Sequence, residues 1–256
     1  MEIGCYSAFV VQQTLKEKLK ALKEIGYDFL ELTLRQEDVD ALDDRAMDDT
    51  VRASESVGLP IRSLSLGAFS GFAAACKEEA SRAVKLRTVE KAVELAHRCG
   101  AGVILCASWE PEGGPGAMER YKTYLPPLAD RAAEKGVKLA IEHIGSSRFL
   151  NSPTGVKQIA RTINHPAVGV YYDIGNAIHA GEDPVAAIPR IGSLIFQVHL
   201  KGIGDRPLER MPLDAVLEEL DAIGYRGRGA TEVSKKDATD NEHLAEALRT
   251  LRAHGF

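Results

Sequence analysis

The feature that most constrains the fold is a strand-like segment followed by a helix-like segment, repeated eight times along the chain. Each unit takes about 30 residues and begins with a short apolar run. Strands that alternate with helices form parallel βαβ units, because a parallel connection needs a crossover helix. We expect strands at residues 3–7, 27–33, 61–66, 102–108, 137–143, 168–173, 194–200 and 227–233.

The helix-like segments end where the sequence supplies a stop signal. Gly26, Gly100, Gly136 and Gly224 each follow the last turn expected of a helix, where a left-handed residue is favoured. We expect helices at about 12–25, 44–57, 78–99, 117–135, 154–163, 183–191, 212–223 and 241–253.

Eight such units in a chain of 256 residues match the size of a (β/α)₈ TIM barrel, an α/β fold, built as one domain from residues 1–256. The alternative is a doubly wound sheet, which more often carries a glycine-rich phosphate turn after its first strand. Here the first strand leads into CYSAFVVQQT, with neither a GxGxxG nor a GxxxxGK[ST] motif. The barrel is therefore favoured, and its active site is expected at the carboxyl ends of the strands.

The composition disfavours several classes of protein. A net charge of −5 and a pI of about 5.9 argue against non-specific nucleic-acid binding. The four cysteines form no CxxC pair, so we expect reduced thiols and no structural zinc knuckle. The N-terminal segment lacks the pattern of a signal peptide, and no apolar stretch is long enough to span a membrane. We therefore expect a cytoplasmic protein that binds neither nucleic acid nor membranes.

Potential metal ligands end four consecutive predicted strands. Glu142, Asp173, His199 and Glu232 belong to the segments IEH, YYDIGN, VHLKG and TEV. They are separated by 31, 26 and 33 residues, about one βα unit each. A single carboxylate at a strand end is more often a turn or cap residue, but four such residues in register indicate a shared metal ion. An ion would also offset the cost of ending an apolar strand on the charged Asp173.

Three carboxylates and one imidazole form a donor set that suits Mn²⁺, Mg²⁺ or Co²⁺, with Zn²⁺ as a further candidate. The fifth and eighth strands lie roughly 135° apart around a barrel, so Glu142 and Glu232 are expected to face each other across its mouth. Two opposed carboxylates can act as base and acid on opposite faces of one carbon. The ion would polarise a carbonyl and stabilise the enediolate that forms when a proton leaves the neighbouring carbon.

In their order and spacing, IEH, YYDIGNA, VHLKG and TEV resemble the xylose isomerase-like TIM-barrel superfamily, and most of all its sugar or sugar-phosphate isomerase/epimerase branch. That branch includes ketose 3-epimerases, hydroxypyruvate isomerase, L-ribulose-phosphate epimerases and inosose dehydratases. The segments RFLNSP and IGYRGRGATEV extend the resemblance over nearly the whole chain. It implies one divalent ion held by Glu142, Asp173, His199 and Glu232, with the two glutamates also moving protons. It further implies a small carbohydrate-like substrate and a homo-oligomer, as in many relatives.

Three departures from the family pattern leave the substrate open. Ketose 3-epimerases have a histidine three residues after the aspartate, where this chain has Asn176. Asparagine can hydrogen-bond a substrate hydroxyl but cannot carry a proton at neutral pH. Gly202 makes the usual HLKD segment HLKG, and LERMPL at 208–213 replaces a Gly-Glu-Gly turn.

Four further residues join Asn176 as candidate substrate contacts. Strand alternation places Lys201 on the same face as His199, and Arg206 lies roughly where relatives have a substrate-binding arginine. Two cations would suit a phosphorylated or carboxylated substrate. Glu31 ends the second strand and could bind a substrate hydroxyl, support another site residue, or be a hydrogen-bonded barrel residue. Trp109, in the loop after the fourth strand, is either a wall of the substrate site or a packed surface residue.

The expected activity is metal-dependent isomerisation or epimerisation of a small sugar, ketose, hydroxy-keto acid or sugar phosphate. The alternative is a dehydratase of the same superfamily, such as an inosose or dehydroshikimate dehydratase, which removes a proton and then expels a hydroxyl. The apurinic endonuclease branch, with three zinc ions, needs more histidines at strand ends than this chain supplies, since only His199 of its seven fits. A barrel that only binds or scaffolds is disfavoured because all four ligand positions are filled.

Overall fold

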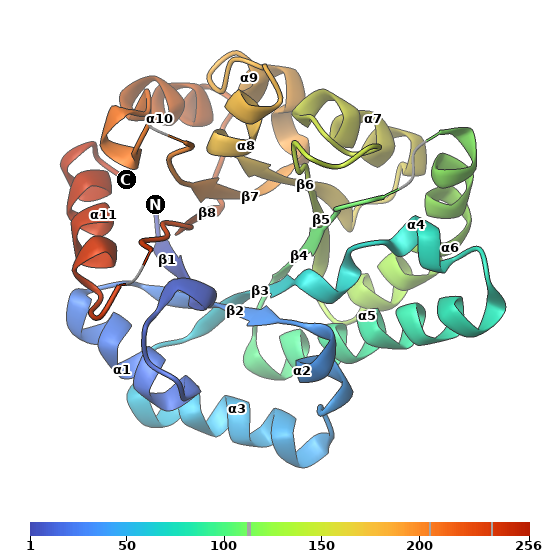
Figure 1. Ribbon diagram of the computed structural model, residues 1–256, viewed down its shortest axis with the longest axis horizontal. Helices are drawn as coiled ribbons and strands as arrows, with labels where there is room; N and C mark the ends of the chain where they lie inside the picture. Colours follow the sequence, from blue (N-terminus) through green and yellow to red (C-terminus); the bar gives the residue numbers. More distant parts are fainter. Residues whose placement is uncertain (112–113, 205, 237) are drawn as a thin grey trace.

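The eight predicted strands form one closed parallel barrel (Figure 1). The structure is a computed structural model and describes residues 1–111, 114–204, 206–236 and 238–256. Neighbouring strands pair in chain order, and β1 pairs with both β2 and β8, which closes the ring. The strands are β1 (Ile3–Tyr6), β2 (Phe29–Leu34), β3 (Ile61–Leu66), β4 (Val103–Ala107), β5 (Lys138–Glu142), β6 (Val168–Asp173), β7 (Ile195–Leu200) and β8 (Arg228–Thr231).

Helices surround the barrel and cover its outer face (Figure 1). Gly26 and Gly100 take left-handed conformations just after α1 and α5, with φ of 103° and 69°, as the sequence predicts. In the part of the chain that the structure describes, no helix combines the length and apolar character that a membrane crossing needs. The helices are α1 (Leu15–Ile25), α2 (Gln36–Asp40), α3 (Asp44–Val57), α4 (Phe72–Ala75), α5 (Glu79–Cys99), α6 (Pro115–Glu134), α7 (Pro153–Ile163), α8 (Ile174–His179), α9 (Ala187–Ile191), α10 (Leu213–Ala222) and α11 (Glu242–Ala253).

The segment between β6 and β7 differs from the sequence prediction. The helix expected at 183–191 begins only at Ala187, because the Asp183 side chain accepts hydrogen bonds from two backbone N–H groups (2.8 and 3.1 Å) and shapes a turn. The short helix α8 starts directly after Asp173 and is not predicted from the sequence. Its six residues are too few to show a periodic apolar pattern.

The barrel interior is filled by side chains from alternating strand positions. A small apolar cluster consists of Val103, Leu105, Ala140 and Tyr171. Beside it lies a polar layer, which we define as Glu31, Ser63, Tyr171 and Gln197 joined by hydrogen bonds. The interior is therefore a packed core, and the space for a ligand lies at the carboxyl ends of the strands.

Candidate active site

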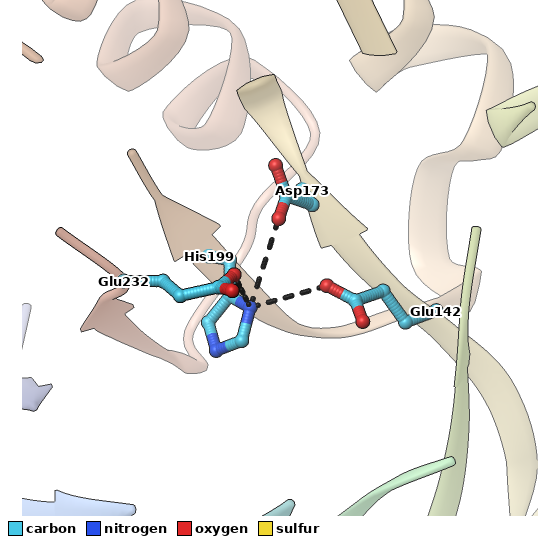
Figure 2. A group of neighbouring side chains, drawn as sticks. All are labelled: Glu142, Asp173, His199 and Glu232. Atoms are coloured by element: carbon cyan, nitrogen blue, oxygen red, sulfur yellow. Dashed lines mark hydrogen bonds and ion pairs between the residues drawn. The ribbon is translucent and has the colours of Figure 1, made fainter. Parts of the chain in front are cut away.

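Four potential metal ligands meet at the carboxyl ends of neighbouring strands (Figure 2). Glu142 and Asp173 are the last residues of β5 and β6. His199 is next to last in β7, and Glu232 directly follows β8. One donor atom of each lies within 4.8 Å of the others. The parallel fold therefore gathers these residues, which are far apart in sequence, into what we call the ligand cluster.

The His199 imidazole stands at the centre of the ligand cluster (Figure 2). Its Nδ1 lies 3.2 Å from Glu142 Oε1 and 3.0 Å from Glu232 Oε2. Asp173 Oδ2 is the third neighbour of this nitrogen, at 3.7 Å. In Figure 2 the Glu142 side chain extends toward Nδ1 from the right and the Glu232 side chain from the left, so two carboxylates from different strands meet at this nitrogen. Their roles in proton transfer stay a prediction.

The other imidazole nitrogen is held by a buried carboxylate. His199 Nε2 lies 2.7 Å from Glu31 Oε1. Glu31 Oε2 in turn accepts hydrogen bonds from Ser63 (2.6 Å), Tyr171 (2.6 Å) and Gln197 (3.1 Å). When Nε2–H donates to Glu31, the neutral imidazole keeps its lone pair on Nδ1, which faces the three carboxylates.

The position of Glu31 matches one of the roles expected for it, the support of another site residue, while a substrate contact stays an untested prediction. The side chain is fully buried, and both carboxylate oxygens are engaged by protein groups. Burial alone would raise the pKa of Glu31, but the charge of His199 and the hydrogen bonds hold this pKa below its usual value. A charged carboxylate in this place orients the imidazole and makes it a better metal ligand.

Burial and neighbouring charges shift the pKa values of the ligand cluster. Burial raises the pKa of Glu142 to about 7, although His199 opposes this change. Burial would also raise the pKa of Asp173, but the charges and hydrogen bonds of Lys201 and His199 together outweigh it, and the pKa lies below its usual range. Burial disfavours the imidazolium form of His199, yet its acidic neighbours hold the pKa well above its usual value. The carboxylates therefore create a negative potential that favours a bound cation.

The ligand cluster fits a divalent metal ion in its chemistry. Carboxylate oxygens are the donors that Mn²⁺ and Mg²⁺ prefer, and an imidazole lone pair adds affinity for Co²⁺ or Zn²⁺. Metal-binding histidines usually donate their other ring N–H to a carboxylate or carbonyl oxygen, and Glu31 is such an acceptor for His199 Nε2. The cluster can therefore hold a metal ion, while the identity of the ion stays a prediction.

A cavity of about 460 Å³ opens beside Glu232, between the loops that follow β1, β7 and β8. This volume suits a small sugar-sized ligand. Arg206 and Lys235 line the cavity and form no ion pair within the ranges that the structure covers. The carboxylates of Glu209 and Glu246 also line it, so both signs of charge are present.

The predicted substrate contacts have different positions relative to this cavity. Lys201 lines it, and Arg206 is exposed at its edge. Asn176 is buried in α8, where its Nδ2 donates to the backbone oxygen of His143 (2.9 Å) and ties α8 to the end of β5. Trp109 is 45% exposed in the loop after β4 and does not line the cavity. Substrate binding by these residues stays a prediction.

The site also contains residues that the sequence analysis missed. The Tyr6 ring, at the end of β1, packs edge-on against the His199 ring with centroids 5.8 Å apart. Phe9 packs against Tyr6 at 5.3 Å and lines the cavity. The position of Tyr6 at a strand end was an available signal, since the four ligand positions are recognised in the same way.

A comparison with protein families decides the relationship of this chain. Residues 19–254 match the model of the xylose isomerase-like TIM barrel. The chain belongs to the xylose isomerase-like TIM-barrel family. This finding confirms the resemblance read from the strand-end segments, and the closed parallel barrel confirms the expected fold.

Several proteins that are similar to this xylose isomerase-like barrel are sugar epimerases. The L-ribulose-5-phosphate 3-epimerase UlaE of Escherichia coli (strain SMS-3-5 / SECEC) is 27% identical over 244 residues, which is 88% of this chain and 84% of UlaE. The crystal structure of the E. coli 3-keto-D-glucoside 4-epimerase YcjR, in its apo form, has a TM-score of 0.82 at 20% identity and covers 99% of both chains. The crystal structure of the IOLI protein with a bound zinc atom has a TM-score of 0.79 at 20% identity, covering 99% of this chain and 96% of IOLI. At these identities the two crystal structures show a shared fold.

Proposed function

We propose that this protein is a divalent-metal-dependent isomerase or epimerase of a small ketose, hydroxy-keto acid or sugar phosphate. One observation carries the proposal: the carboxylates of Glu142, at the end of β5, and Glu232, just after β8, both lie against His199 Nδ1, at 3.2 and 3.0 Å, within a largely buried group of potential metal ligands. Moving a proton between the two faces of one carbon needs such a pair of groups. The names of UlaE and YcjR, both epimerases, support the same class of reaction.

The residues of the ligand cluster have different roles in the proposed reaction. When bound by Glu142, Asp173, His199 and Glu232, a divalent ion supplies a Lewis acid for a substrate carbonyl. Either Glu142 or Glu232 removes a proton from the carbon next to that carbonyl, and the other delivers a proton to the opposite face. Asp173 and His199 keep the donor geometry, and Glu31 keeps the imidazole in the tautomer whose lone pair is on Nδ1.

The cavity beside Glu232 is the proposed substrate site. Arg206 lies at its edge with no ion-pair partner in the described residues, and a guanidinium group is well suited to a phosphate or carboxylate. Lys201 and Asn176 lie nearer the ligand cluster, where a hydroxyl next to the carbonyl would be placed. Trp109 would take part only as a wall of the site, from the loop after β4.

Proton exchange with solvent tests the proposed chemistry directly. The protein is loaded with Mn²⁺ in deuterated water and offered a panel of ketoses and ketose phosphates, including L-ribulose 5-phosphate. We expect deuterium at the carbon next to the carbonyl, in a product that is epimerised or isomerised, and none after treatment with EDTA. Exchange with no member of the panel would contradict the proposal, and release of water from an inosose or from dehydroshikimate would assign the protein to the dehydratases.

Two variants test the opposed pair. Glu142→Gln and Glu232→Gln are each expected to abolish inversion, because one face of the substrate loses its proton-transferring group. Each variant should still exchange deuterium into only one of the two epimers, since the remaining carboxylate reaches one face. Bound metal is measured in each variant, and Glu110→Gln is the control, because Glu110 is a buried carboxylate that bonds to Tyr121 instead of the ligand cluster. Inversion at the wild-type rate in either test variant would refute the two-carboxylate mechanism.

A further inference from the structure

The ammonium group of Lys201 touches two members of the ligand cluster. Its Nζ lies 2.8 Å from Asp173 Oδ2 and 2.8 Å from Glu232 Oε2. These two oxygens are the same ones that face His199 Nδ1, at 3.7 and 3.0 Å. Lys201 therefore contacts the oxygens to which a divalent ion would bind, instead of pointing only into the cavity.

The backbone makes room for this lysine on two sides. A Cβ atom on Gly175 would lie 2.9 Å from Lys201 Cγ, so a glycine at this place lets the lysine stem pass over the start of α8. Gly202 allows the chain to turn back at once, because a Cβ there would collide with the backbone oxygen of Arg206. The Lys201 side chain is only 15% exposed as a result. Its contact with the ligand cluster is thus part of the fold and not a chance position of a surface lysine.

The contact between Lys201 and the ligand cluster balances the charge of the carboxylates. Glu142, Asp173 and Glu232 bring three carboxylates within 4.8 Å of one another, two of them buried and Glu232 partly buried, where like charges repel strongly. Lys201 places a positive charge directly against two of them. A divalent ion among the same oxygens would be repelled by the ammonium group, because both cations would lie a few ångströms apart.

We propose that Lys201 is a positioning residue that acts as the resident cation of the metal site. It holds the carboxylates of Asp173 and Glu232 together in the ion-free protein, and it weakens the binding of a divalent ion by charge repulsion. The inference rests on the proposed metal site. Its consequence is that removing the ammonium group destabilises the ion-free protein and, at the same time, tightens ion binding.

Titration calorimetry with Mn²⁺ on chelator-treated protein tests this role. We expect Lys201→Met to bind Mn²⁺ about tenfold more tightly than the wild type, or more, because a nearby unit charge is removed. Without the ion, the same variant should melt at a lower temperature. Lys201→Arg keeps the charge and should stay within about threefold of the wild type. Arg210→Met, which removes an exposed cation from the same connection outside the ligand cluster, should leave the affinity unchanged.

The outcomes separate the two levels of the proposal. No Mn²⁺ binding by the wild type would overturn the metal site itself. Wild-type binding, with equal or weaker binding by Lys201→Met, would overturn the role of Lys201 alone. If the ion-free variant does not fold, it is purified with Mn²⁺ and the release of the ion into excess EDTA is followed; release slower than from the wild type is expected, and equal or faster release contradicts the proposal.

Discussion

Replacing Glu31 by glutamine tests whether the polar layer inside the barrel controls the proposed metal site. The two side chains have nearly the same shape, so the substitution removes one charge and adds two N–H donors. Glu31 is fully buried and accepts hydrogen bonds on both sides: from His199 at Oε1, and from three donors of the polar layer at Oε2. A glutamine amide has only one oxygen and cannot replace both acceptors.

Either orientation of the new amide costs free energy. If its NH₂ group faces His199 Nε2 (2.7 Å in the wild type), the imidazole must carry its proton on Nδ1, where it blocks a metal ion. If the NH₂ group faces the polar layer instead, it meets the amide nitrogen of Gln197, which lies 3.1 Å from Glu31 Oε2. Two donors then face each other in a buried place, which leaves a polar group unpaired.

The expected size of the effect follows from the bond that is lost. Changing the hydrogen-bond partner of a metal-binding histidine typically lowers metal affinity about 10- to 100-fold, which is roughly 1.4 to 2.8 kcal/mol. Because the bond from His199 to Glu31 is short, buried and charge-assisted, we expect the upper part of this range. Mn²⁺ titration calorimetry near neutral pH measures it.

Two matched variants show whether the effect belongs to Glu31. Ser63→Ala removes one donor from Glu31 Oε2 but leaves the His199 bond, so we expect a loss of about threefold or less. Glu110→Gln changes another buried carboxylate, which bonds to Tyr121, and should leave the Mn²⁺ affinity unchanged. Wild-type Mn²⁺ affinity in Glu31→Gln would refute the reasoning that the polar layer sets the histidine tautomer.

Three further predictions concern ion binding, the substrate and pH. Mn²⁺ at about 100 times its dissociation constant should stabilise EDTA-treated protein by about 2.7 kcal/mol in urea denaturation, and no shift would argue against the site. Arg206→Met should raise KM for a phosphorylated ketose about tenfold with kcat nearly unchanged, whereas equal KM values would remove Arg206 from the substrate site. Burial raises the pKa of Glu110, so the stability it contributes is full below its unfolded pKa of about 4.5 and is lost as pH rises through the folded pKa. The urea midpoint of Glu110→Gln should therefore rise relative to that of the wild type as the pH increases above about 4.5, and a difference that is constant with pH would contradict this.

The barrel and the ligand positions were predictable because local patterns encode them. Each strand is a short apolar run, and the glycines that end the helices need a left-handed conformation that few other residues adopt. Glu142, Asp173 and Glu232 stand out because each is a charge at the end of a buried run. A repeat of one βα unit then brings them to the same face without any knowledge of side-chain contacts.

The partners of these residues were not predictable in the same way. Glu31 was expected at the end of the second strand, but it is the third residue of β2, and its carboxylate points to His199, which is 168 positions further along the chain. Nothing local distinguishes it from a substrate contact. Lys201 was expected on the correct face, but the salt bridges to Asp173 and Glu232 depend on the space left by Gly175. Such contacts depend on the closure of the barrel and not on any one segment.

Two register shifts determine which inward side chains meet. Between β2 and β3 the regular pairing shifts just before Glu31, and this shift sets Glu31 opposite Ser63. Between β6 and β7 it shifts just before Tyr171, and this shift sets Tyr171 opposite Gln197. These four residues are the polar layer. An extra residue in one strand redirects the side chains that follow it, so both irregularities act at the level of the barrel that supports the imidazole.

The shift between β6 and β7 also fixes the ligand cluster. After it, Asp173 lies opposite His199. Without it, the register that pairs Val170 with Ile195 would continue and set Asp173 opposite Val198, whose side chain belongs to the core between barrel and helices. Since side chains alternate along a strand, the imidazole would then have no aspartate beside it on the same face. One irregularity in pairing therefore connects the polar layer with the proposed metal ligands. For this reason the Glu31→Gln substitution is expected to affect metal binding by Asp173 and His199.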